Sequence, residues 1–213
     1  MKAGEQLLMS TDWLQWHDAY AGLAGRLTAV QNQIERHLTN TNPDSVRVIS
    51  ACAGDGRDLL GVLAGRKDAA RVSALLVEYD ATLAARAREA AEPLPSAIEV
   101  VRADAARSDV YAHAVPADLV LLCGIFGNIS DADVRATIEA APELCAPGAE
   151  VVWTRHRREP DLTPAIRDWF AGAGFDEVAF VAPENETWSV GVHRLATAPR
   201  PFEPGRHWFT FLR

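Results

Sequence analysis

The segment from residue 46 to residue 63 constrains the fold of this chain more than any other. It opens with a short, β-branched apolar run, which predicts a strand buried in a parallel sheet. Residues 53–56 carry minimal side chains, so the backbone can turn sharply there and approach a ligand closely. A helix then starts at residue 57, and its free N–H groups point back at the turn. Such a unit predicts a nucleotide-type cradle, although Gly-x-Gly turns also occur as plain tight connections.

Strands and helices alternate along the following part of the chain. Short apolar runs end in turn residues, and stretches of helix-forming residues between them stop at residues such as Pro93. We expect strands at residues 74–80, 98–102, 118–126 and 149–154, and helices at residues 81–91, 131–144 and 163–172. This alternation predicts a doubly wound, Rossmann-like α/β sheet that binds ligands at the carboxyl ends of its strands.

The C-terminal part of the chain breaks the alternation. Residues 175–181 and 187–195 both predict strands, and the loop between them has no room for a helix. They predict a hairpin that inserts an antiparallel strand at the edge of a mostly parallel, seven-stranded sheet. A nicotinamide-binding domain usually continues with parallel strands and helices, so the hairpin argues against that class. Residues 207–212 are also compatible with a last strand.

The first 42 residues predict a helical cap on a core formed by residues 43–213, within a single domain. Apolar residues recur at helical spacing through this cap, which favours an amphipathic helix that packs on the sheet. The polar tips of Trp16, His17 and Tyr20 are costly to bury without partners. We therefore expect these three side chains to line a pocket wall or a lid.

Three strand ends carry the residues that a nucleoside ligand needs. Small residues follow the first strand, and Glu78 and Asp104 follow the next two. A carboxylate about 20 residues beyond a glycine turn suits a grip on ribose hydroxyls. One such acid could be a solvated strand end, but the three features in this order indicate a nucleoside cofactor.

In these residues the chain resembles the class I S-adenosylmethionine-dependent methyltransferases, over about residues 44–195, and most of all an actinobacterial-type branch of that family. The motif Ser50-Ala-Cys-Ala-Gly-Asp-Gly56 is similar to the family's acidic-x-Gly-x-Gly-x-Gly signature. The resemblance implies that S-adenosyl-L-methionine is the cofactor and S-adenosyl-L-homocysteine the product. It also implies a ribose acid, an adenine pair formed by a carboxylate and an N–H group, and a fourth-strand end that receives the methionine moiety. The implied cofactor-binding residues are Ser50, Cys52, Ala53, Gly54, Gly56, Asp58, Glu78, Tyr79, Asp104, Ala105, Cys123 and Gly124.

Two residues depart from the family pattern. Ser50 stands where the family has its leading acid, and Cys52 stands where it has its first glycine. A cysteine side chain at that point requires a different turn or a shifted methionine end. Asp55 or Asp58 could replace the missing acid as the partner of the cofactor ammonium. The helix dipole explains Asp58 equally well.

The chemistry implied by the resemblance is an in-line displacement at the sulfonium methyl, directed at an oxygen or nitrogen nucleophile of a small molecule. Such an acceptor needs a general base, for which the candidates are His156, His17 and Tyr20. Candidate substrate-binding residues are Trp16, Asn128 and Arg155. Two of these have plainer interpretations, because Asn128 could cap a turn and Arg155 could belong to a solvated cluster. His193 lies within a predicted strand and is expected to be packed.

The composition of the chain limits the kinds of molecule that it is expected to bind. The chain has 21 Lys and Arg against 29 Asp and Glu, a formal charge of −8, which disfavours a nucleic-acid backbone despite the basic residues 155–158. No apolar run approaches the roughly 20 residues of a membrane span, and the first residues lack the apolar core of a signal peptide. The three cysteines are scattered, which predicts neither disulfides nor a metal site. We expect a cytoplasmic protein acting on a small molecule, and leave open a homodimer.

Two alternatives remain from the residues alone. The same fold and cofactor could serve aminopropyl transfer or cyclisation, with Asp55, Asp58 and Asn128 around the cofactor tail. The departures at Ser50 and Cys52 could instead mark a noncatalytic cofactor-binding module.

Overall fold

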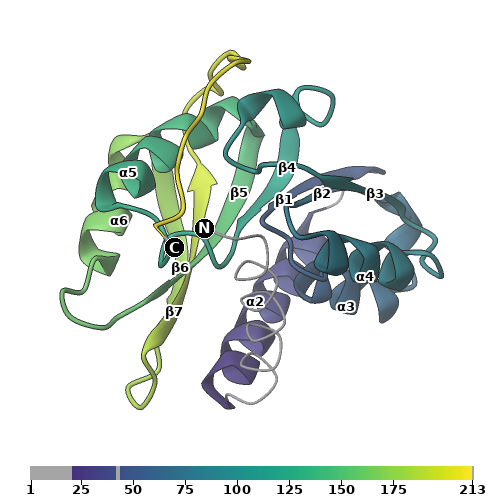
Figure 1. Cartoon of the computed structure of the whole chain (residues 1–213), viewed down its shortest axis with the longest axis horizontal. Helices are drawn as coiled ribbons and strands as arrows, with labels where there is room; N and C mark the ends of the chain where they lie inside the picture. Colours follow the sequence, from purple (N-terminus) through teal and green to yellow (C-terminus); the bar gives the residue numbers. More distant parts are fainter. Residues whose placement is uncertain (1–20, 42–43, 213) are drawn as a thin grey trace, which may run out of the picture.

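The computed structural model describes residues 21–41 and 44–212, with side chains from residue 24 onward. In this part of the chain seven strands form one sheet in the order β3-β2-β1-β4-β5-β7-β6 (Figure 1). The strands are β1 (Val46–Ala51), β2 (Val72–Glu78), β3 (Ala97–Arg102), β4 (Ala117–Leu122), β5 (Cys145–His156), β6 (Phe175–Val181) and β7 (Trp188–Leu195). The predicted α/β sheet with one antiparallel strand is confirmed.

The described residues also form five α-helices, of which α2 precedes the first strand, and three short 3₁₀ turns. The helices are α2 (Ala21–Asn40), α3 (Arg57–Ala64), α4 (Ala81–Ala91), α5 (Asp131–Ala140) and α6 (Thr163–Gly172). The 3₁₀ turns are η1 (Ala69–Arg71), η2 (Ser108–Tyr111) and η3 (Ala141–Glu143). Strands β3, β2, β1, β4 and β5 run parallel, so their carboxyl ends meet at one edge of the sheet. The strand order reverses between β1 and β4, where open α/β sheets bind ligands.

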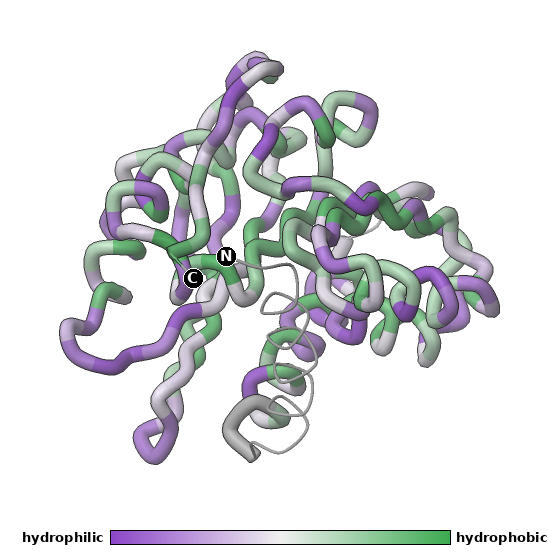
Figure 2. Tube along the Cα trace, viewed as in Figure 1, coloured by the Kyte–Doolittle hydropathy of each residue, from purple (hydrophilic) through white to green (hydrophobic). Residues whose placement is uncertain are grey.

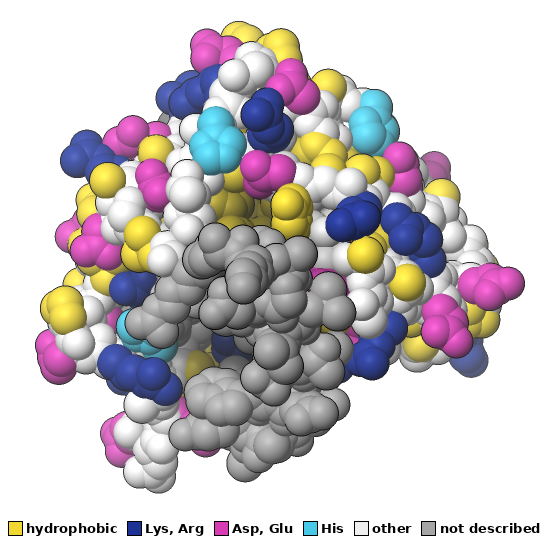
Figure 3. All heavy atoms as spheres, viewed as in Figure 1, with side chains coloured by type: hydrophobic (Ala, Val, Ile, Leu, Met, Phe, Trp, Pro, Cys, Tyr) yellow, Lys and Arg dark blue, Asp and Glu magenta, His cyan; other side chains and the backbone are white. Residues whose placement is uncertain are grey.

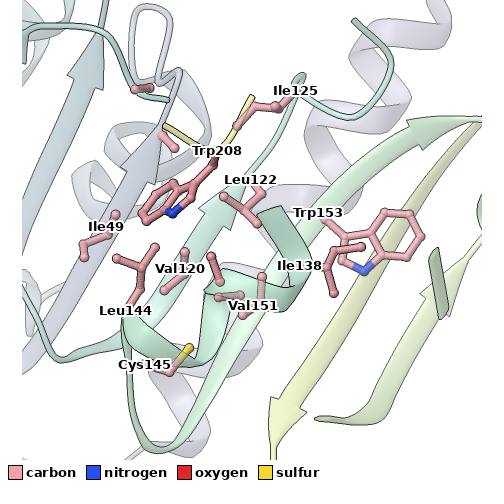
Figure 4. Packing of buried hydrophobic residues seen from close by; sticks show 14 of the residues in the cluster. Ile49, Val120, Leu122, Ile125, Ile138, Leu144, Cys145, Val151, Trp153 and Trp208 are labelled. Carbon is pink, nitrogen blue, oxygen red and sulfur yellow. The ribbon is translucent and has the colours of Figure 1, made fainter. Parts of the chain in front are cut away.

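Two hydrophobic clusters sandwich the sheet. On one face, Val30, Ile34 and Leu38 of α2 pack with α3, α4 and the sheet. On the other face, α5, α6 and the C-terminal segment pack against the strands. In Figure 4, Trp208 of that segment projects among buried residues of β1 and β4, while Trp153 lies farther along the sheet. Figure 2 shows hydrophobic residues along the strands and hydrophilic ones at the turn between β6 and β7.

The C-terminal hairpin lies at the edge of the sheet and inserts one antiparallel strand, as expected. β7 runs antiparallel to both β5 and β6 and separates them, so β6 and not the inserted strand forms the edge. Residues 207–212 do not join the sheet. Among the described residues they make only two isolated bridges, Arg107 to His207 and Ile129 to Phe211.

Several boundaries differ from the sequence expectation. β4 ends at Leu122, because Gly124 at φ +77° begins a series of turns where the apolar run predicted continued strand. β5 already begins at Cys145 and passes through Pro147 and Gly148, with an irregular register against β4. The predicted helix at 131–144 ends earlier, at Ala140, and continues as a 3₁₀ turn.

The predicted N-terminal helix is confirmed only for the part that the structure describes. α2 covers residues 21–40, and its apolar stripe packs on the sheet as expected. Trp16, His17 and Tyr20 lie outside the described residues, so their proposed place at a pocket wall or lid stays a prediction.

Candidate active site

The glycine turn after β1 keeps the left-handed geometry that its glycines allow. Gly54 and Gly56 have φ values of +61° and +75°. A Cβ atom at Gly56 would lie 2.7 Å from Leu60 Cδ1, so this glycine is required for close packing. A Cβ atom at Gly54 would meet no atom of the described residues within 4 Å, so none of them blocks the backbone there. Gly54 is therefore the point at which a ligand can approach the turn.

Cys52 adopts in this turn a backbone conformation that is typical of glycine. Its φ of +54° lies in the left-handed region, which a side chain adopts only at a cost in free energy. The residue packs against the cluster on the α5 face, and burial raises the pKa of its thiol. The turn is thus retained despite the departure from the family pattern. Ser50, the other departure, is buried within β1.

Glu78 ties the end of β2 to the glycine turn. Its Oε2 accepts the Gly54 N–H at 2.7 Å, and its Oε1 accepts the Asp80 N–H at 2.8 Å. The residue is only 8% exposed, and burial raises the pKa of the carboxyl above its usual value. Each oxygen retains a further lone pair for a hydroxyl donor. The next residue, Tyr79, is exposed.

Asp104 and Ala105 form the corresponding end of β3. Asp104 Oδ1 accepts the Ala106 N–H at 3.0 Å, and Asp104 Oδ2 lies 3.5 Å from His207 Nε2. The Ala105 carbonyl accepts the hydroxyl of Tyr111 at 2.7 Å. The Ala105 N–H donates no hydrogen bond to the described residues. Within the described residues, Asp104 thus keeps a carboxylate lone pair and its neighbour Ala105 keeps an N–H for a ligand.

A cavity of about 70 Å³ lies between the glycine turn and the end of β4. Asp58 at the start of α3 lines it, and burial raises the pKa of this carboxyl to about 6. Arg26 of α2 lines it from the other side, and the two charges attract each other. Asp55 instead pairs with Arg57 at 2.5 Å. Of the two acids considered from sequence, Asp58 is the one that faces the cavity.

The end of β4 is held by its neighbours. The Gly124 N–H donates to Thr154 Oγ1 of β5 at 2.8 Å, and the Gly124 carbonyl accepts Asn128 Nδ2 at 2.8 Å. Cys123 and Gly124 both line the cavity. Asn128 therefore caps its own turn, the plainer of its two interpretations, and its carboxamide oxygen remains for other donors.

His156 and Arg155 follow at the end of β5. A Cβ atom on Gly127 would lie 3.4 Å from His156 Cδ2, which places the imidazole beside the loop after β4. Burial lowers the pKa of His156, and the charges of Arg155 and Arg158 lower it further, so the ring is neutral at pH 7. Its buried Nδ1 has no partner among the described residues. Arg155 donates to the carbonyl of Phe126 and so fixes that loop.

His193 is packed, as its place in a strand predicted. It is 1% exposed, and Trp153 Nε1 donates to its Nδ1 at 3.0 Å.

Among the described residues no cluster of His, Cys, Asp or Glu could hold a metal ion. Within the same residues no helix has the length and apolarity of a membrane span. Acidic and basic side chains are interspersed on the described part of the face in Figure 3.

Sequence reasoning missed Arg26, Thr154 and His207. α2 showed only an apolar stripe in the sequence, and no motif links residue 26 to the glycine turn. Thr154 and His207 approach the site only because β5 and the C-terminal segment fold back beside it. The structure does bring together the turn, Glu78, the Asp104–Ala105 pair and the Cys123–Gly124 pair at one edge of the sheet.

No family model matches this sequence, and no curated protein matches it. Solved structures match well. The magnesium protoporphyrin IX methyltransferase of Synechocystis PCC 6803, solved with bound S-adenosylmethionine, is similar at a TM-score of 0.62 and 12% identity, over 81% of this chain and 80% of that one. The CurJ carbon methyltransferase is similar at a TM-score of 0.65 and 14% identity, over 88% of this chain and 58% of that one.

An O-methyltransferase family protein from Burkholderia thailandensis is also similar, with a TM-score of 0.59 and 16% identity, over 78% of this chain and 56% of that one. The chain thus spans just over half the length of two of these three proteins. At such identities the likeness establishes architecture alone. The seven-stranded sheet with its single antiparallel strand therefore has the fold of the class I S-adenosylmethionine-dependent methyltransferases.

Proposed function

We propose that the protein transfers the methyl group of S-adenosylmethionine to an oxygen or nitrogen nucleophile of a small molecule. The observation that carries this proposal is the bond from the Gly54 N–H to the Glu78 carboxylate at 2.7 Å. It joins the end of β2 to the turn after β1, and β1 is one of the two strands, β1 and β4, between which the strand order reverses. The net charge of −8 favours a small acceptor over a nucleic acid.

The residues present fit a nucleoside ligand. No atom of the described residues crowds the Cα of Gly54 or Gly124, so that part of the chain lets a ligand approach both strand ends closely. Glu78 offers lone pairs to the two ribose hydroxyls. Asp104 and the Ala105 N–H offer the acceptor and the donor that the Watson–Crick edge of adenine requires.

The cavity between α2 and α3 suits the amino-acid end of the cofactor. Asp58 supplies a negative charge for the ammonium, and Arg26 supplies a positive charge for the carboxylate. Opposite charges on two walls match a zwitterion better than a neutral chain. Asp58 thereby replaces the acid that Ser50 removes from the family pattern.

When bound, the cofactor supplies an electrophilic methyl group on a sulfonium. The chain's own residues then position the reactants, which provides most of the rate enhancement in a displacement of this kind. His156, neutral at pH 7 and beside the loop after β4, is the proposed general base that accepts the proton of a hydroxyl or ammonium acceptor. Arg155 positions that loop through the carbonyl of Phe126.

Product analysis tests this function. The protein is incubated with S-adenosylmethionine and a panel of phenols, carboxylic acids and amines, and the nucleoside products are separated. Acceptor-dependent S-adenosylhomocysteine is expected. Methylthioadenosine as the product would favour aminopropyl transfer or cyclisation instead. Tight cofactor binding without either product across the panel would favour a noncatalytic module.

A further inference from the structure

The C-terminal segment, residues 206–212, lies against the candidate site and not against the sheet edge where the chain leaves β7. In Figure 1 this yellow segment descends across the view to the C-terminus. Trp208 inserts into the core and stacks on Tyr111 of η2, with ring centroids 5.5 Å apart. The segment is therefore anchored by a buried side chain and not merely laid on the surface.

The segment holds the loop after β3 by several contacts. The Trp208 N–H donates to the Ala106 carbonyl at 2.9 Å, and the Ser108 N–H donates to the Arg206 carbonyl at 3.0 Å. His207 Nε2 lies 3.5 Å from Asp104 Oδ2. Tyr111, beneath Trp208, donates to the Ala105 carbonyl. Residues 104–106, which carry the adenine-type donor and acceptor, are thus all fixed from this side.

The same segment reaches the loop after β4. The Leu212 N–H donates to the Asn128 carbonyl at 3.0 Å, and the Thr210 N–H donates to Asp133 Oδ2 at 3.2 Å. It thereby ties together two loops that flank the crevice at the strand carboxyl ends. β3 and β4 end before these loops, and β5 holds the second of them through Thr154 and Arg155.

The geometry points to His207 as a positioning residue for adenine recognition. A carboxylate on an exposed loop can rotate about its Cβ–Cγ bond, and a hydrogen bond lost to rotation costs affinity. The Ala106 N–H holds Asp104 Oδ1, and His207 restrains Oδ2. The two contacts fix the plane of the carboxylate, so that it accepts the exocyclic amino group of adenine while the Ala105 N–H donates to the adjacent ring nitrogen. This inference rests on the proposed function.

The test compares two ligands that differ at that edge of the base. S-adenosyl-L-homocysteine carries an amino group, and S-inosyl-L-homocysteine carries a carbonyl oxygen in its place. Calorimetric titration gives the ratio of their affinities for the wild-type protein and for His207→Ala. The variant is expected to bind S-adenosylhomocysteine about fivefold more weakly, roughly the net contribution of one hydrogen bond. Its affinity for the inosyl compound stays unchanged, so the ratio falls by the same factor.

Two further variants separate positioning from general stability. His207→Gln, which keeps a donor, is expected to restore the wild-type ratio within twofold. His113→Ala is the matched control, because His113 makes a similarly exposed pair at 2.9 Å, with Glu99 inside β3 and not with Asp104. It is expected to leave the ratio unchanged.

If His207→Ala kept the wild-type ratio of the two affinities, or bound both ligands equally more weakly, the inference would be overturned. The proposed function would still stand. Failure of the wild-type protein to bind either ligand would overturn both.

Discussion

The two ends of the parallel strands hold buried carboxylates in opposite states. Near the amino ends, Glu150 is 2% exposed and bonds to Arg36, His37 and Arg194 at 2.6, 3.1 and 2.8 Å. Burial alone would raise the pKa of Glu150, but these hydrogen bonds lower it to about 2. Near the carboxyl ends, burial raises the pKa of Asp58 to about 6 with one opposing charge, Arg26, beside it.

The difference in pKa distinguishes a carboxylate with a structural role from carboxylates that can bind a ligand. The partners of Glu150 come from α2 and β7, so this residue of β5 links α2 to the two strands. With three partners, its carboxylate is used within the protein and not for a ligand. Burial raises the pKa of Glu78 and of Asp58 above the ordinary value, a state that costs stability and is kept at functional sites. The account therefore predicts that changes at Glu150 affect folding, and that changes at Glu78 or Asp58 affect binding.

The largest expected effect is on stability. Glu150→Gln should lower the free energy of unfolding by about 2–3 kcal/mol, less than for a fully buried pair because Arg36 and Arg194 are partly exposed. Cofactor affinity should not change. Urea denaturation measures the loss, with Glu139→Gln, in an exposed pair with Arg135, as the matched control. A loss no larger than that of the control would contradict the structural role of Glu150.

The next effect is on affinity. Glu78→Gln should weaken S-adenosylhomocysteine binding about 30-fold, because a charged acceptor of the ribose hydroxyls is replaced by an amide. The melting temperature should change little, since Gln can still accept one of the two backbone N–H groups. Glu99→Gln, an exposed acid on β3, serves as the control. Unchanged affinity would remove Glu78 from the ribose role.

Asp58 predicts a pH dependence. Its carboxyl is protonated below about pH 6, so affinity for the cofactor ammonium should fall as the pH drops below 6, by up to tenfold per pH unit. Asp58→Asn should abolish this dependence. A carboxyl whose pKa is raised by folding destabilises the protein above that pKa, so Asp58→Asn should also raise the melting temperature at pH 7. A wild-type affinity that is constant between pH 5 and pH 7 would count against the assignment.

The smallest effect concerns Cys52. Cys52→Gly relieves the left-handed strain but removes a packed thiol, so stability should change by less than about 1 kcal/mol. Cys52→Val should destabilise more, because a β-branched residue tolerates a φ of +54° poorly. The melting temperatures of the two variants, measured by thermal denaturation, test this difference. Equal melting temperatures for the two variants would show that this backbone is not strained.

The sequence predicted those features of the fold and the site that depend on residues close together along the chain. The glycine turn, the acids at Glu78 and Asp104, and the hairpin after residue 175 all follow from local pattern. It could not predict contacts that join distant segments. Nothing local shows that Arg26 faces Asp58, which is 32 positions away in the printed sequence, or that His207 returns to Asp104.

Local pattern also misplaced elements that tertiary pairing decides. β5 runs through Pro147 and Gly148, residues that predict a break, because Cys145 pairs with Ala117 across the sheet. Asn128 Nδ2 donates to the Gly124 carbonyl, a contact that no local pattern predicts, and its role as a substrate ligand stays a prediction.

Calorimetric titration of the wild-type protein with S-adenosylmethionine and with S-adenosylhomocysteine tests the central claim most directly. The cradle formed by the glycine turn, Glu78 and Asp104 predicts that both bind, with dissociation constants in the low micromolar range, about 1–10 μM. Binding of neither would contradict the account. It would mean that the serine at position 50 and the cysteine at position 52 have abolished the cofactor site.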